Sequence, residues 1–359
     1  MAVTIAVLRE RVAGERRLAL VPALVAKYAA HDVRLLLERG AGDAAGLPDD
    51  AFDGVEVVDA DALVAADLVL CVQPPPPDFI ARLRAGAIVV GLLAPHRAQD
   101  TVEAMADRGV IGFAMEKVPR ISRAQAMDAL SSQASVAGYA AVLIGANSLP
   151  RFLPMLTTAA GTIRPAKALI IGAGVAGLQA IATARRLGAV VEAYDVRAAA
   201  REQVQSLGAR FVDIPIQAEA AGGYARELTD DERAEQQRIL AEHVAAADLV
   251  ICTAAIPGRP APRIVTAAMV KAMRPGSVLV DLAAESGGNC ELTQPGEDVV
   301  VRGVTVIGPL NLASRLAAHA SEMYARNLYN FTAPLMKDGA LTVDWDDEIY
   351  KAAAVTGAP

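Results

Sequence analysis

The stretch from Lys167 to Arg197 constrains the fold of this 359-residue chain more than any other part of the sequence. An apolar segment at 168–171 leads directly into a glycine-rich turn at 172–177, and a helical pattern follows. A second apolar segment at 190–194 then ends in an acidic residue, Asp195. Strand, glycine-rich turn, helix, strand and acid in this order form the context in which G-x-G-x-x-G predicts a dinucleotide-binding fold.

Each glycine of this turn has a separate physical role. Gly172 permits the tight turn, Gly174 lets the backbone approach a pyrophosphate, and Gly177 lets helix and strand pack closely. The helix N-terminus offers unpaired N–H groups and a positive dipole end to the phosphates. Asp195 follows Gly177 by 18 residues and can accept hydrogen bonds from an adenosine ribose. The predicted cofactor contacts are Gly172, Gly174, Val175, Ala176, Gly177, Asp195, Val196 and Arg197, together with Ala255 from a later loop.

The acidic residue also predicts which dinucleotide binds. Arg197 follows Asp195 by two residues, and an arginine in this region can accept a 2′-phosphate. Asp195 would repel that phosphate at close range. The predicted cofactor is therefore NAD(H) and not NADP(H).

Composition argues against several other classes of protein. A net charge of −7 argues against nucleic-acid binding, because phosphate binding needs a basic surface. The longest apolar candidate, Val136–Ala146, falls short of the ~18 residues expected of a membrane span. Met1–Leu8 is followed at once by charged residues, which favours a first strand over a signal peptide. The three scattered cysteines, Cys71, Cys252 and Cys290, predict neither a disulfide framework nor a metal site and suit a reducing cytoplasm.

Paired segments indicate that one structural plan occurs twice. Continuous apolar strands alternate with helical patterns, which predicts parallel sheets covered on both faces. We therefore predict an α/β fold with two doubly wound Rossmann-like domains and a cleft between them. The first comprises residues 1–125 plus 313–359, and the second, 126–312, carries the glycine fingerprint. The paired segments are 66–71 with 247–252, 84–90 with 274–280, and 108–110 with 302–304.

The apolar segments also give the expected positions of strands and helices. A helix from about Ala124 to Ser148 is expected to lead from the first domain to the second, and a helical tail, 313–330, to pack back on the first. Strands are expected near 3–8, 33–37, 55–58, 68–72, 88–93 and 110–114, and near 168–171, 190–194, 209–212, 248–253, 277–282 and 304–307.

One connection, Asp213–Leu228, is unusually long for a compact domain, and such loops are usually functional or mobile. It contains Gly222, Gly223 and Tyr224. Two glycines beside a tyrosine suit a lid that closes an aromatic ring over a ligand. A plain surface excursion is the alternative.

A polar stripe marks the start of the linking helix. Gln125, Asp128, Ser132 and Ser135 follow helical spacing and share one face, with Ser131 at its edge. A solvated face would normally carry Glu and Lys, whereas an amide such as that of Gln125 can pair with the carboxamide of a nicotinamide ring. The spacing alone leaves cofactor contact and a solvated or capping role equally open.

With these motifs, the chain closely resembles the NAD(H)-binding component of the proton-translocating nicotinamide nucleotide transhydrogenases, in its separately encoded form, a family related to the alanine dehydrogenases. The resemblance covers nearly the whole chain, although the segment after about Met336 departs from the family pattern. It is strongest at 119–125, 127–128, 131–133, 174–184, 195–198, 221–225, 256–262 and 287–290.

The resemblance implies roles for individual residues. Arg120, Gln125, Asp128 and Ser131 match the loop that holds the nicotinamide and its nearby ribose and phosphates, and the first three are the expected catalytic residues. Asp195 matches the acid on the adenosine ribose. Gly223 and Tyr224 match a mobile loop that closes over bound nucleotide.

The resemblance also implies an activity. The family's reaction is reversible hydride transfer between NAD(H) on this component and NADP(H) on a separate component. A membrane component couples the transfer to proton translocation, and this component is a homodimer. The implied location is the cytoplasm, at the cytoplasmic face of the inner membrane through partner subunits. Hydride transfer between two nicotinamides needs no acid, base, metal or nucleophile from the protein.

Two other functions are weighed against this one. An alanine dehydrogenase shares the fold, and the chain keeps its arginine-like position at Arg17. The lysine position reads Cys71-Val72-Gln73, the histidine position reads Gly91-Leu92-Leu93-Ala94, and the aspartate position reads Glu285. His96, a few residues later, is only a weak candidate for a displaced histidine. Without lysine and histidine, amino-acid oxidation lacks a proton acceptor. A non-enzymatic NAD-binding redox sensor is the second alternative, because fold alone does not exclude it.

Overall fold

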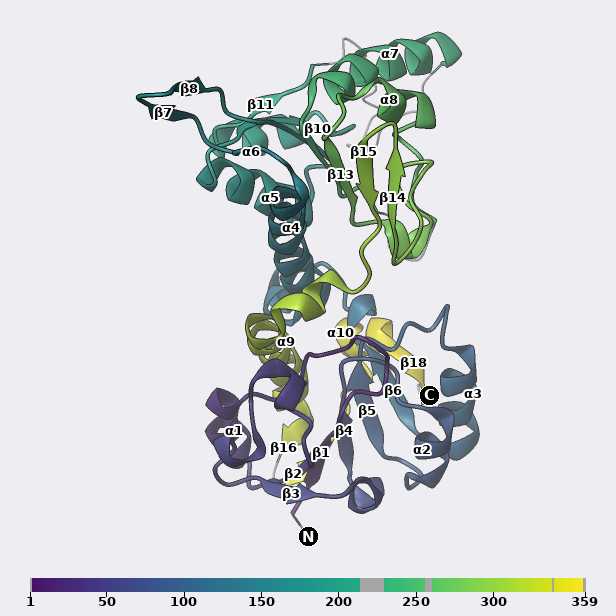
Figure 1. The fold of residues 1–359 in the computed structure, drawn as a ribbon. Helices are drawn as coiled ribbons and strands as arrows, with labels where there is room; N and C mark the ends of the chain where they lie inside the picture. The colour runs from purple at the N-terminus through teal and green to yellow at the C-terminus, as the bar shows by residue number, and fades with distance from the viewer. Residues whose placement is uncertain (1, 214–228, 256–259, 338, 358–359) are drawn as a thin grey trace. The chain divides into compact units, whose positions relative to one another are not determined.

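The computed structural model describes residues 2–213, 229–255, 260–337 and 339–357. The chain divides into two compact units. The first unit holds residues 1–133 and 313–359, and the second holds residues 134–312 (Figure 1). Each is described separately below.

The first unit is built on a seven-stranded sheet in the order β18-β6-β5-β4-β1-β2-β3. Strands β1 to β6 pair in parallel, and β18 runs antiparallel beside β6. The strands are β1 (Thr4–Val7), β2 (Arg34–Glu38), β3 (Glu56–Val58), β4 (Leu68–Leu70), β5 (Ile88–Gly91), β6 (Ile111–Ala114) and β18 (Ala354–Thr356). The helices are α1 (Pro22–Ala29), α2 (Pro77–Arg82), α3 (Gln99–Arg108), α9 (Ala317–Thr332) and α10 (Glu348–Ala353), with a small β16 (Met336–Lys337) and β17 (Ala340–Leu341) pair.

The second unit repeats this plan with the order β11-β10-β9-β12-β13-β15-β14. Its strands are parallel apart from β14, which pairs antiparallel with β15. The strands are β9 (Lys167–Ile171), β10 (Val190–Tyr194), β11 (Arg210–Phe211), β12 (Leu249–Cys252), β13 (Val278–Asp281), β14 (Asp298–Val301) and β15 (Val304–Ile307). The helices are α5 (Val175–Arg186), α6 (Ala200–Ser206), α7 (Asp230–Ala246) and α8 (Ala267–Ala272). The predicted pair of doubly wound parallel sheets is therefore confirmed.

An aspartate just before β4 and another just before β12 show how closely the two units correspond. Asp67 Oδ2 accepts a hydrogen bond from the backbone N–H of Thr4 at 2.7 Å, and Asp248 Oδ2 accepts one from Lys167 N–H at 2.9 Å. In each unit an arginine from the turn before the next strand donates to the other carboxylate oxygen. Arg84 donates to Asp67, and Arg274 donates to Asp248. The resemblance between the paired sequence segments thus reflects a shared contact.

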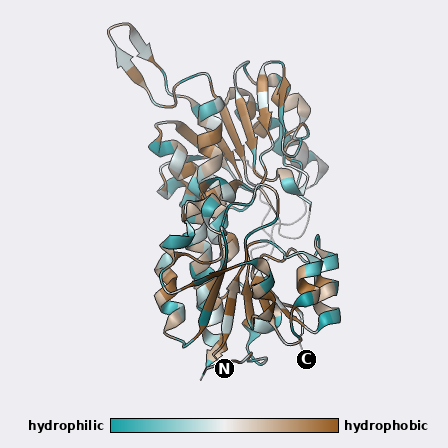
Figure 2. Ribbon diagram, turned by 60° about the horizontal axis from the view of Figure 1, so that its bottom comes forward, coloured by the Kyte–Doolittle hydropathy of each residue, from teal (hydrophilic) through white to brown (hydrophobic). Residues whose placement is uncertain are grey.

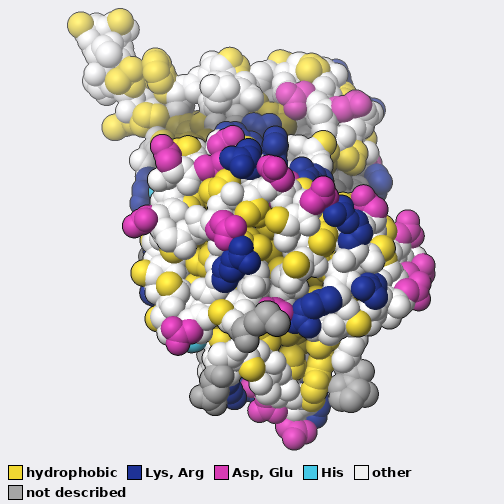
Figure 3. Space-filling view, turned by 90° about the horizontal axis from the view of Figure 1, so that it is seen from below, with side chains coloured by type: hydrophobic (Ala, Val, Ile, Leu, Met, Phe, Trp, Pro, Cys, Tyr) yellow, Lys and Arg dark blue, Asp and Glu magenta, His cyan; other side chains and the backbone are white. Residues whose placement is uncertain are grey.

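The strands form the cores because their runs of Leu, Val and Ile are buried on both faces, as parallel sheets require. In the first unit, α9 packs Tyr324, Leu328 and Phe331 into the same cluster as Ile5 and Phe113. Figure 2 shows the hydrophobic colour concentrated in the strands, whereas the helices mix both colours. Figure 3 shows Lys and Arg interleaved with Asp and Glu on the face of the first unit turned to the viewer.

The linking helix begins later than the sequence predicts. Residues Ser122–Met127 form a short 3-10 helix, and α4 spans Ala129–Ser148. The reason lies at Asp128, whose carboxylate accepts the backbone N–H of Ser131 at 2.8 Å. Such a side chain acts as an N-cap, because it accepts an N–H of the first helical turn. The N-cap residue itself has a non-helical backbone, so the helix begins after it.

Helix α4 also corrects the expectation that no segment has the length and apolar character of a membrane span. Among the described residues it is the one helix that meets both criteria, with a mean hydropathy of 1.3 over its apolar window. Within the second unit it packs tightly, since a Cβ at Gly138 would lie 2.1 Å from the Ala176 carbonyl oxygen, and a Cβ at Gly145 would lie 2.5 Å from Leu249. These contacts are those of a core helix.

A hairpin of β7 (Leu156–Thr158) and β8 (Gly161–Ile163) projects from the second unit and was not expected (Figure 1). All six strand residues are exposed. Phe152, Met155 and Ile163 on and beside it expose 54 %, 65 % and 45 % of their surface.

Candidate functional site

The turn after β9 has the geometry that the glycine pattern demands. Gly172 adopts φ +95°, and a Cβ there would lie 2.7 Å from the Thr253 hydroxyl. At Gly177 a Cβ would lie 1.8 Å from the Gly172 carbonyl oxygen, so any side chain would push helix and turn apart. At Gly174, by contrast, a Cβ would meet open space. Two glycines are therefore required by the fold, and the third leaves the outer side of the turn free for a ligand.

Helix α5 starts at this turn, and no side chain caps its first amides. Gly174 is the N-cap in an extended conformation and supplies no side-chain acceptor. The next residue, Val175, is 42 % exposed. Uncapped N–H groups at a helix start, with the positive end of the helix dipole behind them, favour an anion at this point. The geometry therefore fits a diphosphate.

Asp195 directly follows β10 and lies beside the turn. Its carboxylate accepts the backbone N–H of Ala173 at 2.7 Å and that of Arg197 at 2.8 Å. The Arg197 guanidinium donates to both oxygens, each at 2.9 Å. Burial would raise the pKa of Asp195, but the hydrogen bonds from Arg197 and Ala173 outweigh burial and lower the pKa. Asp195 is therefore an ionised acceptor already held in position, and Val196 beside it is exposed.

The loop after β12 borders the same turn and is fixed by a residue that sequence reasoning did not single out. Asn289 is fully buried; its amide accepts from Ala254 N–H at 3.0 Å and donates to the Ala254 carbonyl at 2.7 Å. Thr253 donates its hydroxyl to the Gly172 carbonyl at 2.9 Å, which ties this loop to the glycine turn. Ala255 follows and is exposed. The only sequence signal for Asn289 was its place in the motif at 287–290.

Among the predicted residues of the first unit, Arg120 precedes the 3-10 segment and Gln125 lies on it, whereas Asp128 and Ser131 lie at the start of α4. Arg120 and Gln125 are exposed, and within the described chain neither side chain has a hydrogen-bonding partner. Asp128 accepts both the N–H and the hydroxyl of Ser131, at 2.8 and 2.6 Å. The prediction of one continuous helical stripe from Gln125 to Ser135 is wrong, because Gln125 precedes the cap and Asp128 forms it. Of the four residues predicted for this site, the structure joins Asp128 and Ser131 by hydrogen bonds.

Helix α9 holds the junction between the 3-10 segment and α4 in place within the first unit. Asn327 and Asn330 donate their amides to the Ala126 carbonyl at 2.9 and 3.1 Å, and Ser132 donates its hydroxyl to Asn327 at 2.7 Å. These contacts fix the backbone on either side of Asp128. Gly223 and Tyr224, with the rest of the predicted lid at 214–228, lie outside the described residues.

Arg17, the position retained from amino-acid dehydrogenases, is bound by a neighbouring carboxylate. Glu15 accepts from Arg17 Nε at 2.8 Å and from Nη2 at 2.6 Å, and the two side chains are 0 % and 4 % exposed. Gln133 accepts from Arg17 Nη1 at 2.9 Å, and Gln73 donates to Glu15 at 2.8 Å. Burial opposes ionisation of Glu15, but the bonds from Arg17 and Gln73 lower its pKa to about 2. The guanidinium is thus neutralised within the fold.

Two parallel doubly wound sheets, one of them carrying a glycine-rich turn with its acid in place, define the class of two-domain Rossmann-type α/β proteins. Residues 6–137 match the family model described as alanine dehydrogenase/PNT, N-terminal domain, and residues 141–358 match the corresponding C-terminal domain. The chain belongs to the alanine dehydrogenase/PNT family.

The relatives of this chain include both transhydrogenases and alanine dehydrogenases. The chain is 45 % identical to the first part of the NAD(P) transhydrogenase subunit alpha of Rhodospirillum rubrum, over 98 % of this chain and 96 % of that protein. It is similar to the crystal structure of a transhydrogenase from Sinorhizobium meliloti, with a TM-score of 0.91, 45 % identity and 99 % of each chain covered. The alanine dehydrogenase of Bacillus subtilis is 31 % identical over 77 % of this chain and 69 % of that protein.

Proposed function

We propose that this chain is the NAD(H)-binding component of a proton-translocating NAD(P) transhydrogenase. The observation that carries the proposal is the 45 % identity to the separately encoded first part of a transhydrogenase alpha subunit, which extends over nearly the full length of both chains. The fingerprint of the second unit agrees with it, because the open side of Gly174, the uncapped start of α5 and the ionised Asp195 suit an adenine dinucleotide.

The proposed roles of the residues combine the resemblance to the transhydrogenases with the surroundings of those residues that the structure describes. The amides of Val175, Ala176 and Gly177 at the start of α5 hold the diphosphate, and Asp195 accepts hydroxyls of the adenosine ribose. Val196, Arg197 and Ala255 border the adenosine, and Gly223 and Tyr224 close over the nucleotide. Arg120, Gln125, Asp128 and Ser131 orient the nicotinamide end.

The chemistry asks the protein for position and not for proton transfer. The nicotinamide ring supplies the hydride-carrying carbon when it is bound. Gln125 fits the carboxamide of that ring, because its amide donates and accepts and has no competing partner in the described chain. Asp128 and Ser131 satisfy each other and keep the loop rigid. Hydride passes to the nicotinamide of NADP⁺ on a partner component, so NADH is oxidised and NADP⁺ is reduced with no proton acceptor.

NAD(H) is preferred over NADP(H) because Asp195 is an ionised, buried acceptor. A 2′-phosphate would place a second anion against it. Arg197 donates from Nε and Nη2 to Asp195, so a 2′-phosphate would have to compete with Asp195 for this guanidinium.

The proposed assembly contains a homodimer of this chain, an NADP(H)-binding component and a membrane component that translocates protons. The β7–β8 hairpin supports the homodimer, because a projecting hairpin with exposed Phe152, Met155 and Ile163 buries its apolar surface only against another molecule. The proposed location is cytoplasmic, peripheral at the cytoplasmic face of the inner membrane through the partner subunits.

Alanine dehydrogenase activity is the second candidate, favoured by the 31 % identity to a Bacillus subtilis enzyme of that name. The first unit argues against it. A substrate carboxylate would need the Arg17 guanidinium, which Glu15 and Gln133 hold. Glutamine at position 73 offers no ammonium, and it too donates to Glu15.

The experiment mixes the purified chain with the NADP(H)-binding and membrane components and supplies NADH and an NADP⁺ analogue. Hydride transfer to the analogue, with no NADH oxidation on pyruvate plus ammonia, supports the proposal. The reverse result would establish the dehydrogenase. NADH binding without either reaction would indicate a redox sensor.

A further inference from the structure

The first unit contains a second acidic residue placed like Asp195. Glu38 is the last residue of β2, the strand that corresponds to β10, and its side chain is 8 % exposed. Its Oε2 accepts the backbone N–H of Arg9, just past β1, at 2.8 Å. Its Oε1 accepts from the guanidinium of Arg11, whose side chain is 51 % exposed.

Asp195 has the same kind of surroundings. A backbone N–H just past β9 and a half-exposed arginine, Arg197, hold it as Arg9 N–H and Arg11 hold Glu38. The correspondence is offset by one residue, because Glu38 lies within β2 whereas Asp195 follows β10. The extra methylene of glutamate offsets that difference. Both units therefore carry a buried carboxylate at the carboxyl end of the second strand.

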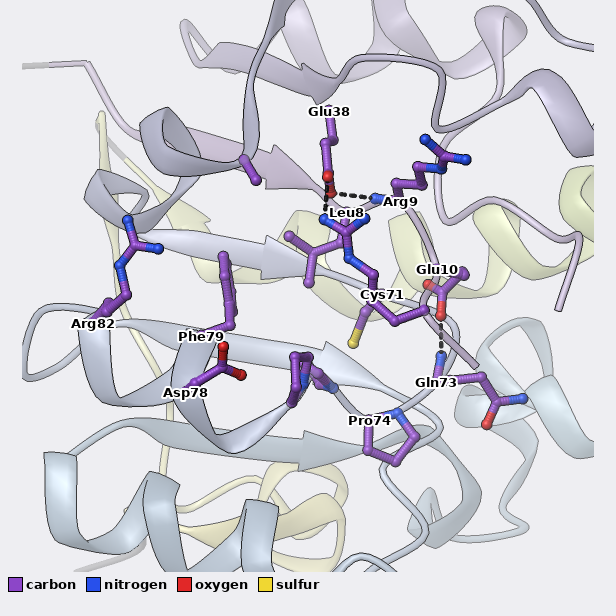
Figure 4. A pocket seen from close by; sticks show the side chains of 14 residues that line it. Leu8, Arg9, Glu10, Glu38, Cys71, Gln73, Pro74, Asp78, Phe79 and Arg82 are labelled. Atoms are coloured by element: carbon purple, nitrogen blue, oxygen red, sulfur yellow. Dashed lines mark hydrogen bonds and ion pairs between the residues drawn. The ribbon is translucent and has the colours of Figure 1, made fainter. Parts of the chain in front are cut away.

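A cavity of about 130 Å³ opens beside Glu38 (Figure 4). It lies at the carboxyl ends of the neighbouring strands β1 and β4. The chain runs outward in opposite directions from these two strands, so the strand order reverses between them. Ligands of doubly wound sheets bind at this switch point. Its walls are mixed, with apolar side chains of Leu8, Cys71 and Phe79 and polar ones that include Glu38 and Gln73.

A larger cavity of about 410 Å³ adjoins it and shares Arg9 and Glu10. Arg9 and Arg16 line this second cavity, and no carboxylate in the described part of the chain is ion-paired with either guanidinium. Glu10 turns its carboxylate to the N–H groups of Val72 and Gln73, at 2.6 and 2.9 Å. Glu15 and Arg17, also in the wall, pair with each other. Arg9 and Arg16 therefore supply two positive charges to the wall, against the one negative charge of Asp43.

Glu38 retains the capacity to bind a vicinal diol. A carboxylate offers about four acceptor positions, and the bonds from Arg9 and Arg11 fill two of them. Two adjacent hydroxyls would fill the others. The unit has no diphosphate cradle, however, because β1 ends at Val7 and the next α-helix begins only at Pro22.

We propose that the first unit binds a ribose 5-phosphate group, with the vicinal hydroxyls on Glu38 and the phosphate between Arg9 and Arg16. The smaller cavity admits one sugar and is below the ~300 Å³ at which sites for larger ligands begin. The group can arrive as a free pentose phosphate or within a mononucleotide such as AMP. This site is separate from the glycine turn and does not depend on the proposed transhydrogenase activity.

The test is titration calorimetry on the full-length Asp195→Ala variant, which removes the ribose acceptor of the second unit. The probes are ribose 5-phosphate, AMP, and 2-deoxyribose 5-phosphate, which lacks one hydroxyl of the diol. Ribose 5-phosphate is expected to bind about tenfold or more tightly than the deoxy sugar, the difference expected of one hydrogen bond to a charged group. Stronger binding of AMP than of ribose 5-phosphate identifies the mononucleotide as the source, and the reverse identifies the free sugar phosphate.

Two variants assign the groups. Arg9→Ala should weaken both phosphates about tenfold, and Glu38→Gln should abolish the preference for ribose over deoxyribose. Glu56→Gln, on the exposed edge strand β3, is the matched control and should change nothing. The proposal is overturned if ribose 5-phosphate and AMP do not bind at about 1 mM, or if binding is indifferent to Arg9 and to the diol. Both of these criteria hold even if Glu38→Gln misfolds. Arg9 is exposed, so its variant should fold, and the comparison with the deoxy sugar needs no variant at Glu38.

Discussion

Replacing Asp195 by alanine should weaken NADH binding by about 2 kcal/mol, or about thirtyfold. Two ribose hydroxyls donating to an ionised carboxylate contribute about 1.5 kcal/mol each at the lower end of the usual range. The nucleotide must first displace the Arg197 guanidinium, and this pair is half-exposed on the arginine side, so its loss costs about 1 kcal/mol. The difference between the two contributions gives the expected loss.

The same geometry predicts an opposite effect for Arg197. Arg197→Ala removes the group that occupies both Asp195 oxygens and so the cost of about 1 kcal/mol for displacing it, and NADH affinity should therefore rise by up to about fivefold. In Asp195→Ala the guanidinium is released, so the affinity for NADPH should rise. The double variant should lose that gain, because no cation then remains for the 2′-phosphate.

Fluorescence titration of NADH and NADPH against the parent and the three variants measures all of these affinities. Asp298→Ala, an exposed acid on β14, is the control for the loss of one negative charge. An NADH affinity untouched by Asp195→Ala would falsify the ribose assignment. A larger loss in Arg197→Ala than in Asp195→Ala would refute the view of Arg197 as a displaceable partner.

Three further predictions test other regions of the structure. Gln125→Ala should lower the hydride-transfer rate about 100-fold with a smaller change in NADH affinity, because a misplaced ring loses its alignment; stopped-flow transfer rates beside binding titrations decide this. Gly177→Ala should destabilise the fold by about 1–3 kcal/mol, since its Cβ meets the Gly172 carbonyl, whereas Gly174→Ala should keep thermal stability and weaken NADH; equal melting temperatures for the two variants would contradict it. Glu15, with a pKa lowered to about 2, stabilises the fold above its unfolded pKa of about 4.5, and this stability is lost as pH falls from there to about 2. Urea unfolding of Glu15→Gln should therefore differ from the parent at pH 6 and converge with it towards pH 2.

The strands and the glycine turn could be predicted because their signals are local. A run such as Leu68–Leu70 is apolar at every position, which only a strand buried on both faces explains. The separate roles of Gly172 and Gly177 follow from the turn itself and agree with the geometry. The start of α4 could not be predicted from periodicity, because helical spacing continues through Asp128 and the cap competes with it.

Contacts between distant segments account for what the sequence did not reveal. β18 pairs with β6 across more than two hundred residues, and β14 adds an edge to the second sheet, yet neither is marked by a long apolar run. Asn289 supports the loop after β12, and Glu15 forms an ion pair with Arg17. Both contacts depend on where the side chains lie in the folded chain, which no local pattern reveals. An arginine at position 17 therefore does not by itself indicate amino-acid dehydrogenase activity, because its partners decide whether the guanidinium can bind a substrate.

The two units show how one plan can offer different groups at the carboxyl edge of its sheet. Both keep the order of the first five strands, the aspartate just before the fourth strand and an acid at the end of the second. They differ in the connection after the first strand. In the second unit three residues, Gly172 to Gly174, separate β9 from α5, so the helix N-terminus lies at the carboxyl edge of the sheet. In the first unit the connection runs from Val7 to Pro22, and the charged residues of that segment occupy the edge instead. The length of a single connection thus decides whether the edge offers amides to a diphosphate or side chains to a smaller anion.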